Sequence, residues 1–339
     1  MKIAIITITE DAQKLAENLK DHLINDSTVI SVEIFNKNVK KVLNSVFSEY
    51  DCILGIMATG IMVRNICPLI NNKIEDPAVL VLDDQGKYVI SLLSGHFGGA
   101  NDIALKISKI CGAKPVITTA TDIHGKMGID SLARKYYFDI DNVSKIKAIN
   151  SALVNNEKVD LFVPSNFSFI FEDSMVKKSY NYIKSSDNEV RAKYKENCIE
   201  LKPRKLVVGI GARKGISKES VQKAIHESIN LLNLSLERVD LLSTAEIKKN
   251  EVGIIQTARD LNVPLNIVTV DMIKSLNHPD CTNSKFVEDK FGIPGVCEPA
   301  ALVSAGENSK LIFKKTSFNG VTVAIAVSSV DRINDLINK

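Results

Sequence analysis

Short apolar runs alternate with amphipathic stretches along the first third of the chain. Lys2-Ile3-Ala4-Ile5-Ile6 is typical of a strand, and Thr9-Glu10-Asp11 supplies a helix cap with two acids in the first turn. The next apolar residues recur at spacings of three and four, as on one helix face: Ala12, Leu15, Ala16, Leu19 and Leu23. Because such strand and helix pairs repeat to about residue 136, the pattern predicts a mostly parallel sheet covered by helices on both faces.

Between residues 137 and 204 the pattern changes, and Asn, Ser, Lys and aromatic residues replace the apolar runs. This stretch contains the aromatic run Phe167-Ser168-Phe169-Ile170-Phe171 and a polar run from Lys184 to Glu189. We interpret it as a smaller, looser middle module that ends in a linker. An extended surface insertion of the first domain is the alternative, and the sequence alone does not separate the two.

A second series of strands and helices begins with the apolar run from Lys205 to Gly211, and Ser217 is placed to cap the following helix. Ser243-x-x-Glu246 has the spacing of a capping box, and Val321 to Val327 supplies a late strand. The sequence therefore predicts an α/β protein with mostly parallel, Rossmann-like N-terminal (1–136) and C-terminal (205–339) domains. A smaller middle module (137–204) separates them.

Length and composition agree with several folded domains. At roughly 100–200 residues per domain, a chain of 339 residues predicts two or three. A content of 45% hydrophobic and 24% charged residues excludes a wholly disordered chain. The 43 Lys and Arg residues nearly balance the 40 Asp and Glu residues, so we expect no dedicated nucleic-acid-binding surface.

No apolar run approaches the roughly 18–20 residues that span a bilayer, so we expect no membrane segment. Thr7, Thr9 and Glu10 interrupt the N-terminal apolar run before it reaches the length of a signal peptide. The six cysteines are scattered without a Cys-x-x-Cys pair, which is typical of reduced thiols. Together these features predict a cytoplasmic protein.

Loops after the predicted strands carry the candidate chemistry, because ligands of open α/β sheets bind at the carboxyl ends of strands. The first such loop is Ala58-Thr59-Gly60, with Arg64 one helical turn later. Thr59 and Gly60 are candidate ligand contacts, and the guanidinium of Arg64 suits a carboxylate. A glycine turn beside a surface arginine is the alternative interpretation.

The segment from Ser94 to Asn101 is more informative, because it places three glycines at one strand-to-helix junction. Glycines permit a close approach of the backbone to a ligand. The candidate ligand contacts are Ser94, Gly95, Gly98, Gly99 and Asn101. His96 can exchange a proton near neutral pH, and its place among glycines favours a catalytic role, although a single histidine is more often a hydrogen-bonding residue than a catalyst.

Hydroxyl and carboxyl side chains end another predicted strand at Thr118-Thr119-Ala120-Thr121-Asp122. Asp122 is a candidate catalytic residue because it lies near the strand end, and Thr121 is a candidate ligand contact. Asp130 is placed to cap the next helix. The histidines and acids of the chain lack the compact spacing of a zinc site, so we assign no protein-bound metal.

The second unit opens with Gly209-x-Gly211-x-x-x-Gly215, whose last interval is one residue too long for a dinucleotide fingerprint. Gly211, Arg213 and Lys214 are candidate contacts for an anionic ligand, because the two cations lie beside a helix N-terminus. A solvated basic turn is the alternative. Near the end of the chain, Glu298 is either a helix cap or an acid–base candidate.

Five segments taken together resemble the cobalt-precorrin-5A hydrolase family of cobalamin biosynthesis. They are Ala58-Thr59-Gly60-x-x-x-Arg64, Leu92-Leu93-Ser94-Gly95-His96-x-Gly98-Gly99-Ala100-Asn101, Thr118-Thr119-Ala120-Thr121-Asp122, Val208-Gly209-Ile210-Gly211-x-Arg213-Lys214-Gly215 and Gly295-Val296-Cys297-Glu298-Pro299-Ala300-Ala301. The resemblance covers nearly the whole chain and is most specific at Ser-Gly-His-x-Gly-Gly-Ala-Asn. The chain departs from it at Ala212, where family members often have cysteine, and its middle module matches weakly.

The resemblance implies an enzyme of the anaerobic pathway that opens the δ-lactone of a cobalt-bearing, anionic tetrapyrrole and releases acetaldehyde as the ring contracts. The cobalt belongs to the substrate, so no cofactor is expected. A homodimer and contacts with other cobalamin-pathway enzymes are left open. We assign His96 as the preferred general base or acid, with Asp122 as runner-up or orienting partner and Glu298 as a further candidate. The preferred carboxylate contacts are Arg64, Arg213 and Lys214.

These assignments depend on one geometric prediction, in which the rims of two sheets form a single electropositive crevice around the substrate. Two other functions stay open. A non-catalytic tetrapyrrole-binding or carrier protein would use the same anionic contacts. An NAD(P)-dependent oxidoreductase would use the glycine loop at Gly209.

Overall fold

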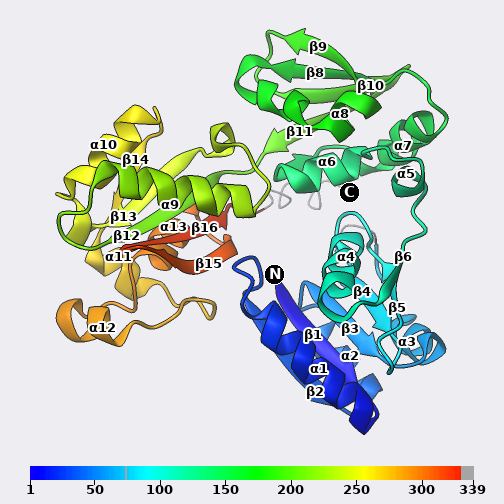
Figure 1. Cartoon of the computed structure of the whole chain (residues 1–339). Coiled ribbons are helices and arrows are strands. Elements are labelled where there is room, and N and C mark those ends of the chain that lie inside the picture. The colour runs from blue at the N-terminus through cyan, green and yellow to red at the C-terminus, as the bar shows by residue number, and fades with distance from the viewer. Residues whose placement is uncertain (73–74, 330–339) are drawn as a thin grey trace.

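The computed structural model describes residues 1–72 and 75–329 and shows three sheets that follow one another along the chain (Figure 1). A six-stranded sheet lies in the N-terminal domain, and a five-stranded sheet lies in each of the central and C-terminal domains. Helices accompany every sheet, so the predicted α/β class is confirmed. The last part of the predicted C-terminal domain, 330–339, lies outside the described residues.

The N-terminal sheet has the order β2-β1-β3-β4-β5-β6. Its strands are β1 (Lys2–Thr7), β2 (Ser31–Asn36), β3 (Cys52–Ile56), β4 (Ala78–Leu82), β5 (Tyr88–Leu93) and β6 (Lys114–Val116). Its helices are α1 (Glu10–Leu23), α2 (Val39–Val46), α3 (Thr59–Ile66) and α4 (Ala100–Cys111). Helices α1 and α4 pack on one face with Ile3 and Ile5, and α2 and α3 pack on the other with Ala4 and Ile6. The prediction of helices on both faces is confirmed.

Strand β5 runs opposite to β4, and this reversal decides which loops share an edge of the sheet. β4 is parallel to β3 but antiparallel to β5, with Val79 opposite Leu93 and Leu82 opposite Val89. The loop after β5 therefore leaves the sheet at the edge where β4 begins, whereas the loop after β3 leaves where β4 ends. Two loops that both follow strands are thus separated by the length of a strand.

The central domain is a packed sheet with helices, so the expectation of a looser module is wrong. Its sheet has the order β7-β11-β10-β8-β9 and is antiparallel except for the β8–β9 pair. The strands are β7 (Phe138–Ile140), β8 (Asp160–Pro164), β9 (Asn181–Ser185), β10 (Val190–Tyr194) and β11 (Asn197–Pro203). Helix α5 (Ala120–Ile123) ends the N-terminal domain and leads into the central one. The helices of the central domain are α6 (Ile129–Lys135), α7 (Ile146–Val154), α8 (Ser174–Ser179) and the 3-10 helices η1 (Val143–Lys145) and η2 (Ser165–Glu172). Helix α6 packs against β7 and α7, so we group it with this domain.

Two segments explain that error. The aromatic run lies in η2, where Phe167 and Phe169 are buried and their ring centroids lie 6.1 Å apart. The polar run at 184–189 carries the chain from β9 to β10 and links no domains. Exposed polar residues at a turn within a domain have the same composition as a linker, so the sequence pattern did not distinguish them.

The C-terminal sheet has the order β14-β13-β12-β16-β15, with β12, β13 and β14 parallel and β16 antiparallel to both of its neighbours. Its strands are β12 (Leu206–Ala212), β13 (Leu241–Ala245), β14 (Leu265–Val268), β15 (Lys310–Phe318) and β16 (Val321–Val327). Its helices are α9 (Lys218–Leu231), α10 (Val252–Asp260), α11 (Val270–Ser275), α12 (Lys285–Phe291), α13 (Cys297–Ala305), η3 (Leu236–Arg238) and η4 (Glu246–Lys248). Helices α9 and α10 cover one face and α13 covers the other.

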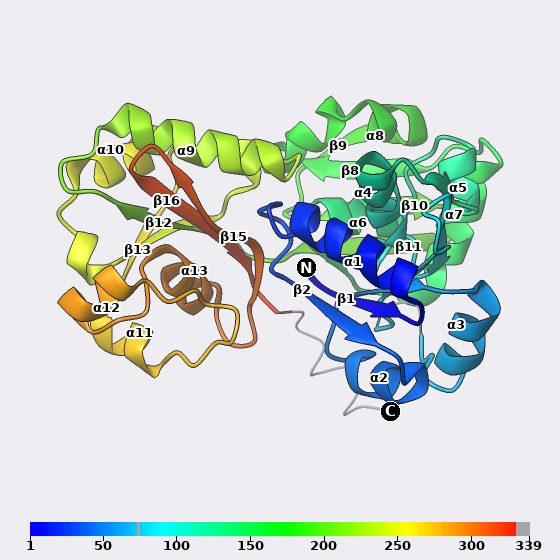
Figure 2. The same ribbon diagram turned by 60° about the horizontal axis from the view of Figure 1, so that its bottom comes forward.

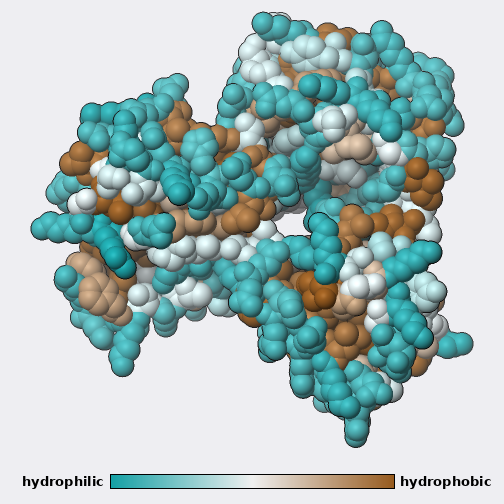
Figure 3. Space-filling model, in the orientation of Figure 1, coloured by the Kyte–Doolittle hydropathy of each residue, from teal (hydrophilic) through white to brown (hydrophobic). Residues whose placement is uncertain are grey.

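Each domain contacts the other two, as Figures 1 and 2 show. The N-terminal and central domains meet around His96. The central and C-terminal domains meet where Nε of Arg238 donates to the carbonyl oxygen of Tyr136 at 2.7 Å. The C-terminal and N-terminal domains contact each other where the backbone N–H of Lys314 donates to the carbonyl oxygen of Ser27 at 2.8 Å. The surface is hollowed where the three domains meet (Figure 3).

Candidate functional site

His96 lies between two carboxylates that come from different domains. It occupies the loop between β5 and α4, at the edge of the N-terminal sheet beside the central domain. Its Nε2 lies 2.7 Å from Oδ2 of Asp122 in α5, and its Nδ1 lies 3.0 Å from Oδ2 of Asp130 in α6. The side chain of His96 is 13% exposed and that of Asp122 is 41% exposed. The structure therefore brings together two of the three predicted catalytic residues.

A network of polar side chains holds Asp122. Its Oδ2 accepts hydrogen bonds from Oγ1 of Thr119 at 2.6 Å and from Nδ2 of Asn101 at 3.1 Å, in addition to that from His96. Asn101 also donates to Oγ1 of Thr119 at 2.8 Å and accepts from Oγ of Ser91 at 2.7 Å. Strand β5, the first turn of α4 and the loop after β6 thus fix one carboxylate.

Asp130 is a partner of His96 that the sequence interpretation missed, because its place in the first turn of a helix indicated only a cap. It is buried, and its Oδ1 accepts from Nδ2 of Asn150 at 3.0 Å and from the backbone N–H of Ser131 at 3.1 Å. Its Oδ2 is bound to His96, which lies 34 positions earlier in the chain. No local spacing in the sequence signals a partner that distant.

The two carboxylates make His96 a cation at neutral pH. Burial lowers the pKa of His96, but hydrogen bonds and charge attraction from Asp122 and Asp130 outweigh it and raise the pKa from 6.5 to about 10. Burial raises the pKa of each carboxyl, yet the hydrogen bond with His96 and other polar contacts leave both pKa values below their usual 3.8. A protonated imidazole has no lone pair that can accept a proton. In this arrangement His96 does not act as a base, and both of its N–H groups are bound, so Asp122 is the candidate base.

The loop around His96 is shaped by close contacts. Gly99 has a φ of +84°, and a Cβ at this position would overlap the guanidinium of Arg134, so the site requires glycine. Ser94 also has a positive φ, +54°, and within the described part of the chain its buried Oγ has no hydrogen-bond partner. The predicted ligand contacts in or beside this loop are Ser94, Gly95, Gly98, Gly99, Asn101 and Thr121, whose Oγ1 lies 3.1 Å from Nε2 of His96.

Thr59, Gly60 and Arg64 lie at the opposite edge of the N-terminal sheet. Helix α3 begins at Thr59 directly after β3, and the reversal of β5 places His96 at the other end of the strands. The exposed Arg64 donates from Nη1 to the carbonyl oxygen of Gly60 at 3.3 Å. Within one chain, these residues do not share a site with His96.

Arg213 and Lys214 are exposed at the carboxyl end of β12. The opposite end of this strand adjoins the central domain, because Leu206 follows directly from the segment that Arg238 binds. At about 3.3 Å per residue, the length of β12 places the basic loop ~20 Å farther from the central domain. Figures 1 and 2 show the loop after β12 on the outer side of the C-terminal domain. The prediction of a single crevice lined by both sheet rims is therefore wrong for one chain.

Two glycines of that predicted loop are part of the core. Gly209 and Gly211 lie in β12 and are buried. A Cβ on Gly209 would overlap the carbonyl oxygen of Cys297 in α13, and one on Gly211 would lie 2.5 Å from Oγ1 of Thr322. These glycines allow a helix and a strand to approach β12, and they are not placed to bind a dinucleotide or the anionic ligand assigned to Gly211.

Glu298 lies in α13 and is 1% exposed. Its Oε2 accepts from the backbone N–H and Oγ1 of Thr282 at 2.8 and 2.7 Å, and its Oε1 accepts from the backbone N–H of Lys315 at 2.9 Å. All these partners belong to the C-terminal domain, so the structure does not bring Glu298 to His96. Its contacts attach the loop that contains Thr282 to β15.

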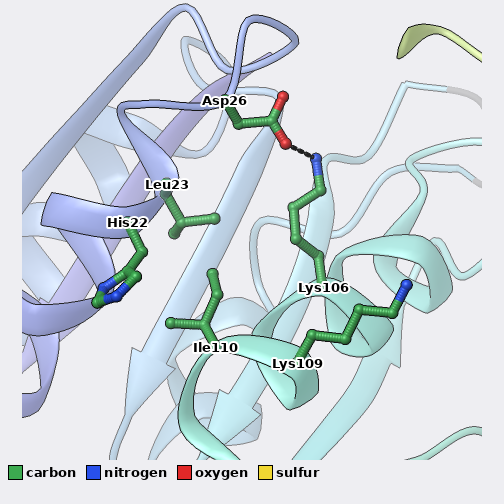
Figure 4. A pocket seen from close by; sticks show the side chains of 6 residues that line it. All are labelled: His22, Leu23, Asp26, Lys106, Lys109 and Ile110. Atoms are coloured by element: carbon green, nitrogen blue, oxygen red, sulfur yellow. Dashed lines mark hydrogen bonds and ion pairs between the residues drawn. The ribbon is translucent and has the colours of Figure 1, made fainter. Parts of the chain in front are cut away.

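A separate open pocket lies between α1 and α4 (Figure 4). Its lining residues are His22, Leu23, Asp26, Lys106, Lys109 and Ile110. Nζ of Lys106 donates to Oδ2 of Asp26 at 2.5 Å, so these two charged groups of the pocket lining are already paired with each other. None of the predicted site residues lines this pocket.

The described part of the chain contains no group of three or more His, Cys, Asp or Glu side chains that could hold a metal ion. The absence of a bound metal or cofactor stays a prediction. Within residues 1–72 and 75–329, no helix has both the length and the apolar character needed to cross a bilayer.

Three family models match successive parts of the chain. The model described as cobalamin synthesis G N-terminal matches residues 41–122, the cobalamin biosynthesis central region matches 127–193, and the cobalamin synthesis G C-terminus matches 206–326. Asp122 lies in the first match and Asp130 in the second. The two carboxylates that bind His96 therefore belong to different matched regions.

Known proteins match over nearly the whole length. A protein of Methanocaldococcus jannaschii, named probable cobalt-precorrin-5A hydrolase, is 32% identical over 97% of this chain and 100% of its own. Cobalt-precorrin-5A hydrolases of Priestia megaterium and Salmonella typhimurium are 26% and 30% identical over 97% and 83% of this chain and 95% and 83% of theirs. A crystal structure of a cobalamin biosynthesis protein G homolog from Sulfolobus solfataricus is 27% identical, covers 97% of both chains and has a TM-score of 0.61. The chain belongs to the cobalt-precorrin-5A hydrolase family of cobalamin biosynthesis, as its motifs predicted.

Proposed function

We propose that this chain is a cobalt-precorrin-5A hydrolase that opens the δ-lactone of a cobalt-bearing tetrapyrrole and releases acetaldehyde. The observation that carries the proposal is the half-exposed carboxylate of Asp122, which is kept ionised by a charged His96. His96 itself lies in the most specific family motif, Ser-Gly-His-x-Gly-Gly-Ala-Asn. The names of three relatives support the substrate class. The cobalt enters with the substrate.

Asp122 acts as the general base in this proposal. Three side chains donate to its Oδ2, and none of these hydrogen bonds uses Oδ1. A water molecule bound to this carboxylate gives up a proton as its oxygen adds to the lactone carbonyl carbon. The acyl C–O bond then breaks, and the departing ring oxygen takes up a proton. General base catalysis of this kind contributes roughly 100- to 10,000-fold to the rate.

Opening the lactone frees a hydroxyl group on the carbon that bears the methyl group. When this hydroxyl gives up its proton, the bond from its carbon to the macrocycle breaks and that carbon leaves as acetaldehyde. The ring carbon keeps the electron pair and takes up a proton. Both N–H groups of His96 are bound to Asp122 and Asp130, so Asp122 is the group that returns the protons in these steps. The proton taken from water goes to the departing ring oxygen, and the proton taken from the hydroxyl goes to the ring carbon.

Lys126 and Lys178 are the cations that we propose for the carboxylate arms of the substrate. Nζ of Lys126 donates to the carbonyl oxygen of Lys178 at 3.4 Å, and Nζ of Lys178 lies against Gly125. The backbone N–H of Lys126 donates to the carbonyl oxygen of Thr121 at 2.8 Å, which fixes the turn directly after Asp122. Both lysines thus contact the turn that follows the proposed base, and their attraction for an anionic macrocycle weakens as salt is added.

Acetaldehyde release from cobalt-precorrin-5A by the purified protein tests this function. We expect turnover by the wild-type chain and a loss of kcat of roughly 100-fold or more in Asp122→Asn, because the amide cannot take the proton. Asp102→Asn, on the neighbouring helix α4, is the matched control and keeps its activity. A carrier protein would bind the macrocycle and release no aldehyde, and an oxidoreductase would consume a nicotinamide cofactor. Either result contradicts the proposal.

The proposed substrate is an anionic small molecule, so the function needs no nucleic acid. A cytoplasmic location, a homodimer and contacts with other enzymes of the cobalamin pathway are further proposals. Light scattering of the purified protein, alone and with a pathway enzyme, tests the two assemblies.

A further inference from the structure

We propose that the central domain completes the active site, with Asp130 as a positioning residue that fixes the imidazole of His96 across the domain boundary. This assignment rests on the proposed function for its kinetic consequence, whereas its geometric part concerns the free protein. Catalytic and positioning carboxylates then lie on opposite sides of one imidazole. The N-terminal domain supplies the first and the central domain supplies the second.

The orientation of the imidazole is fixed because both of its nitrogens are bound. Nε2 lies 2.7 Å from Asp122 and Nδ1 lies 3.0 Å from Asp130. With one partner the ring could turn about its side-chain bonds, but two partners on opposite edges leave one orientation. Asp130 is nine-tenths buried, so water competes little for its bond to His96.

Asp130 is itself held more firmly than a helix cap requires. Asn150 of α7 donates from Nδ2 to Oδ1 of Asp130 at 3.0 Å, and its own Oδ1 accepts from the backbone N–H of Ile129 at 2.9 Å. The backbone N–H of Ser131 binds the same Oδ1 at 3.1 Å. Both carboxylate oxygens of Asp130 are therefore engaged, one by its own domain and one by His96.

Other charged and titratable groups lie around this contact, and one pair supplies a control. Besides Asp122 and Asp130, the guanidinium of Arg134 packs over the loop at Gly99 and pairs with Asp102 of α4. Tyr180, which is buried, lies near Asp130. The pair of Arg134 and Asp102 spans the same domain boundary but does not contact His96. Its loss weakens the boundary and leaves the imidazole in place.

The experiment compares Asp130→Asn with Asp102→Asn in two measurements on the full chain. The first is the titration of His96 followed by NMR of the nitrogen-15-labelled histidines, with His96→Gln identifying its signal. The second is the pH dependence of kcat for acetaldehyde release. We expect Asp130→Asn to lower the His96 titration by roughly one pH unit or more, because it removes an opposite charge in contact with the ring. We expect kcat of Asp130→Asn to fall roughly tenfold at a similar KM. Asp102→Asn should change neither the titration of His96 nor kcat.

A purely structural Asp130 would lower the melting temperature and leave the titration of His96 and the pH profile unchanged, which would overturn the proposal. If Asp130→Asn does not fold, Asn150→Ala keeps the carboxylate but frees it to rotate. A smaller downward shift of the His96 titration in that variant supports the proposal, and no shift overturns it. If the wild-type chain releases no acetaldehyde, the proposed function fails while the titration still tests the position of His96.

Discussion

The two boundaries of the central domain are built in opposite ways. Towards the C-terminal domain the apolar core is continuous, and residues such as Phe138 and Val208 belong to one buried cluster. Arg238, with 0% exposure, donates to the carbonyl oxygens of Tyr136 and Tyr137 in this boundary. An arginine stays charged at all ordinary pH values.

Towards the N-terminal domain the core is not continuous: Phe97 packs against the central core, and the other named contacts are polar. His96 bridges Asp122 and Asp130, and the exposed pair of Arg134 and Asp102 lies beside them. The raised pKa of His96 makes this boundary depend on pH. The comparison shows that the central and C-terminal domains share one apolar core, and that the candidate chemistry lies where the N-terminal domain meets the central one through titratable groups.

Replacing Arg238 is expected to have the largest effect on stability. Arg238→Ala removes one donor from each of the carbonyl oxygens of Tyr136, Tyr137 and Arg204, and it removes the charged partner of Asp240. We expect the free energy of unfolding, measured in urea, to fall by about 3–5 kcal/mol. Arg213→Ala, at an exposed site, is the control and should change it by less than about 0.5 kcal/mol. Equal effects of the two variants would contradict the contrast between the boundaries.

The pH dependence of stability should report the polar boundary. His96 has a folded pKa of about 10, above its usual 6.5, so the folded state holds this proton more tightly. The contribution of His96 to the free energy of unfolding is fully present below pH 6.5 and is lost as the pH rises through about 10. The pKa values of Asp122 and Asp130 are lowered in the folded protein, so their contribution to the free energy of unfolding is lost as the pH falls below 3.8.

Wild type and His96→Gln compared in urea at several pH values test this sign. We expect wild type to be more stable by about 2 kcal/mol near pH 6, because charged hydrogen bonds contribute in this range. The advantage should shrink towards pH 10. A difference that grows with rising pH would show that His96 is neutral in the folded protein.

Asp102→Asn should have the smallest effect. Its side chain is 66% exposed and that of Arg134 is 31% exposed, so water and salt screen their attraction. We expect a loss of at most about 1 kcal/mol in unfolding free energy, which added salt abolishes. A larger loss that persists in high salt would place this pair among the main contacts of the boundary.

Local patterns in the sequence predicted the elements that depend on nearby residues. β1 and α1 were predicted correctly, because the spacing of apolar side chains along the sequence follows the period of a strand or of a helix. The segment from Ser94 to Asn101 was predicted as a candidate site for the same reason, since three glycines at one junction are a local signal. Its association with Asp122 followed from the expectation that strand ends meet at one edge.

The positions of the other candidates could not be predicted in this way. A strand has the same side-chain pattern in either direction, so nothing in Tyr88–Leu93 shows that it runs against β4 and separates His96 from Arg64. Nothing near Asp130 marks it as a partner of His96, because their contact forms only when two domains dock.

The sequence by itself determined the family, the α/β class and the chemical groups available, because these depend on residue identity and short-range spacing. Only the tertiary structure decided which of those groups meet. Strand direction and domain docking are set by the burial of whole faces, and they bring His96 between two acids while leaving the basic loops elsewhere.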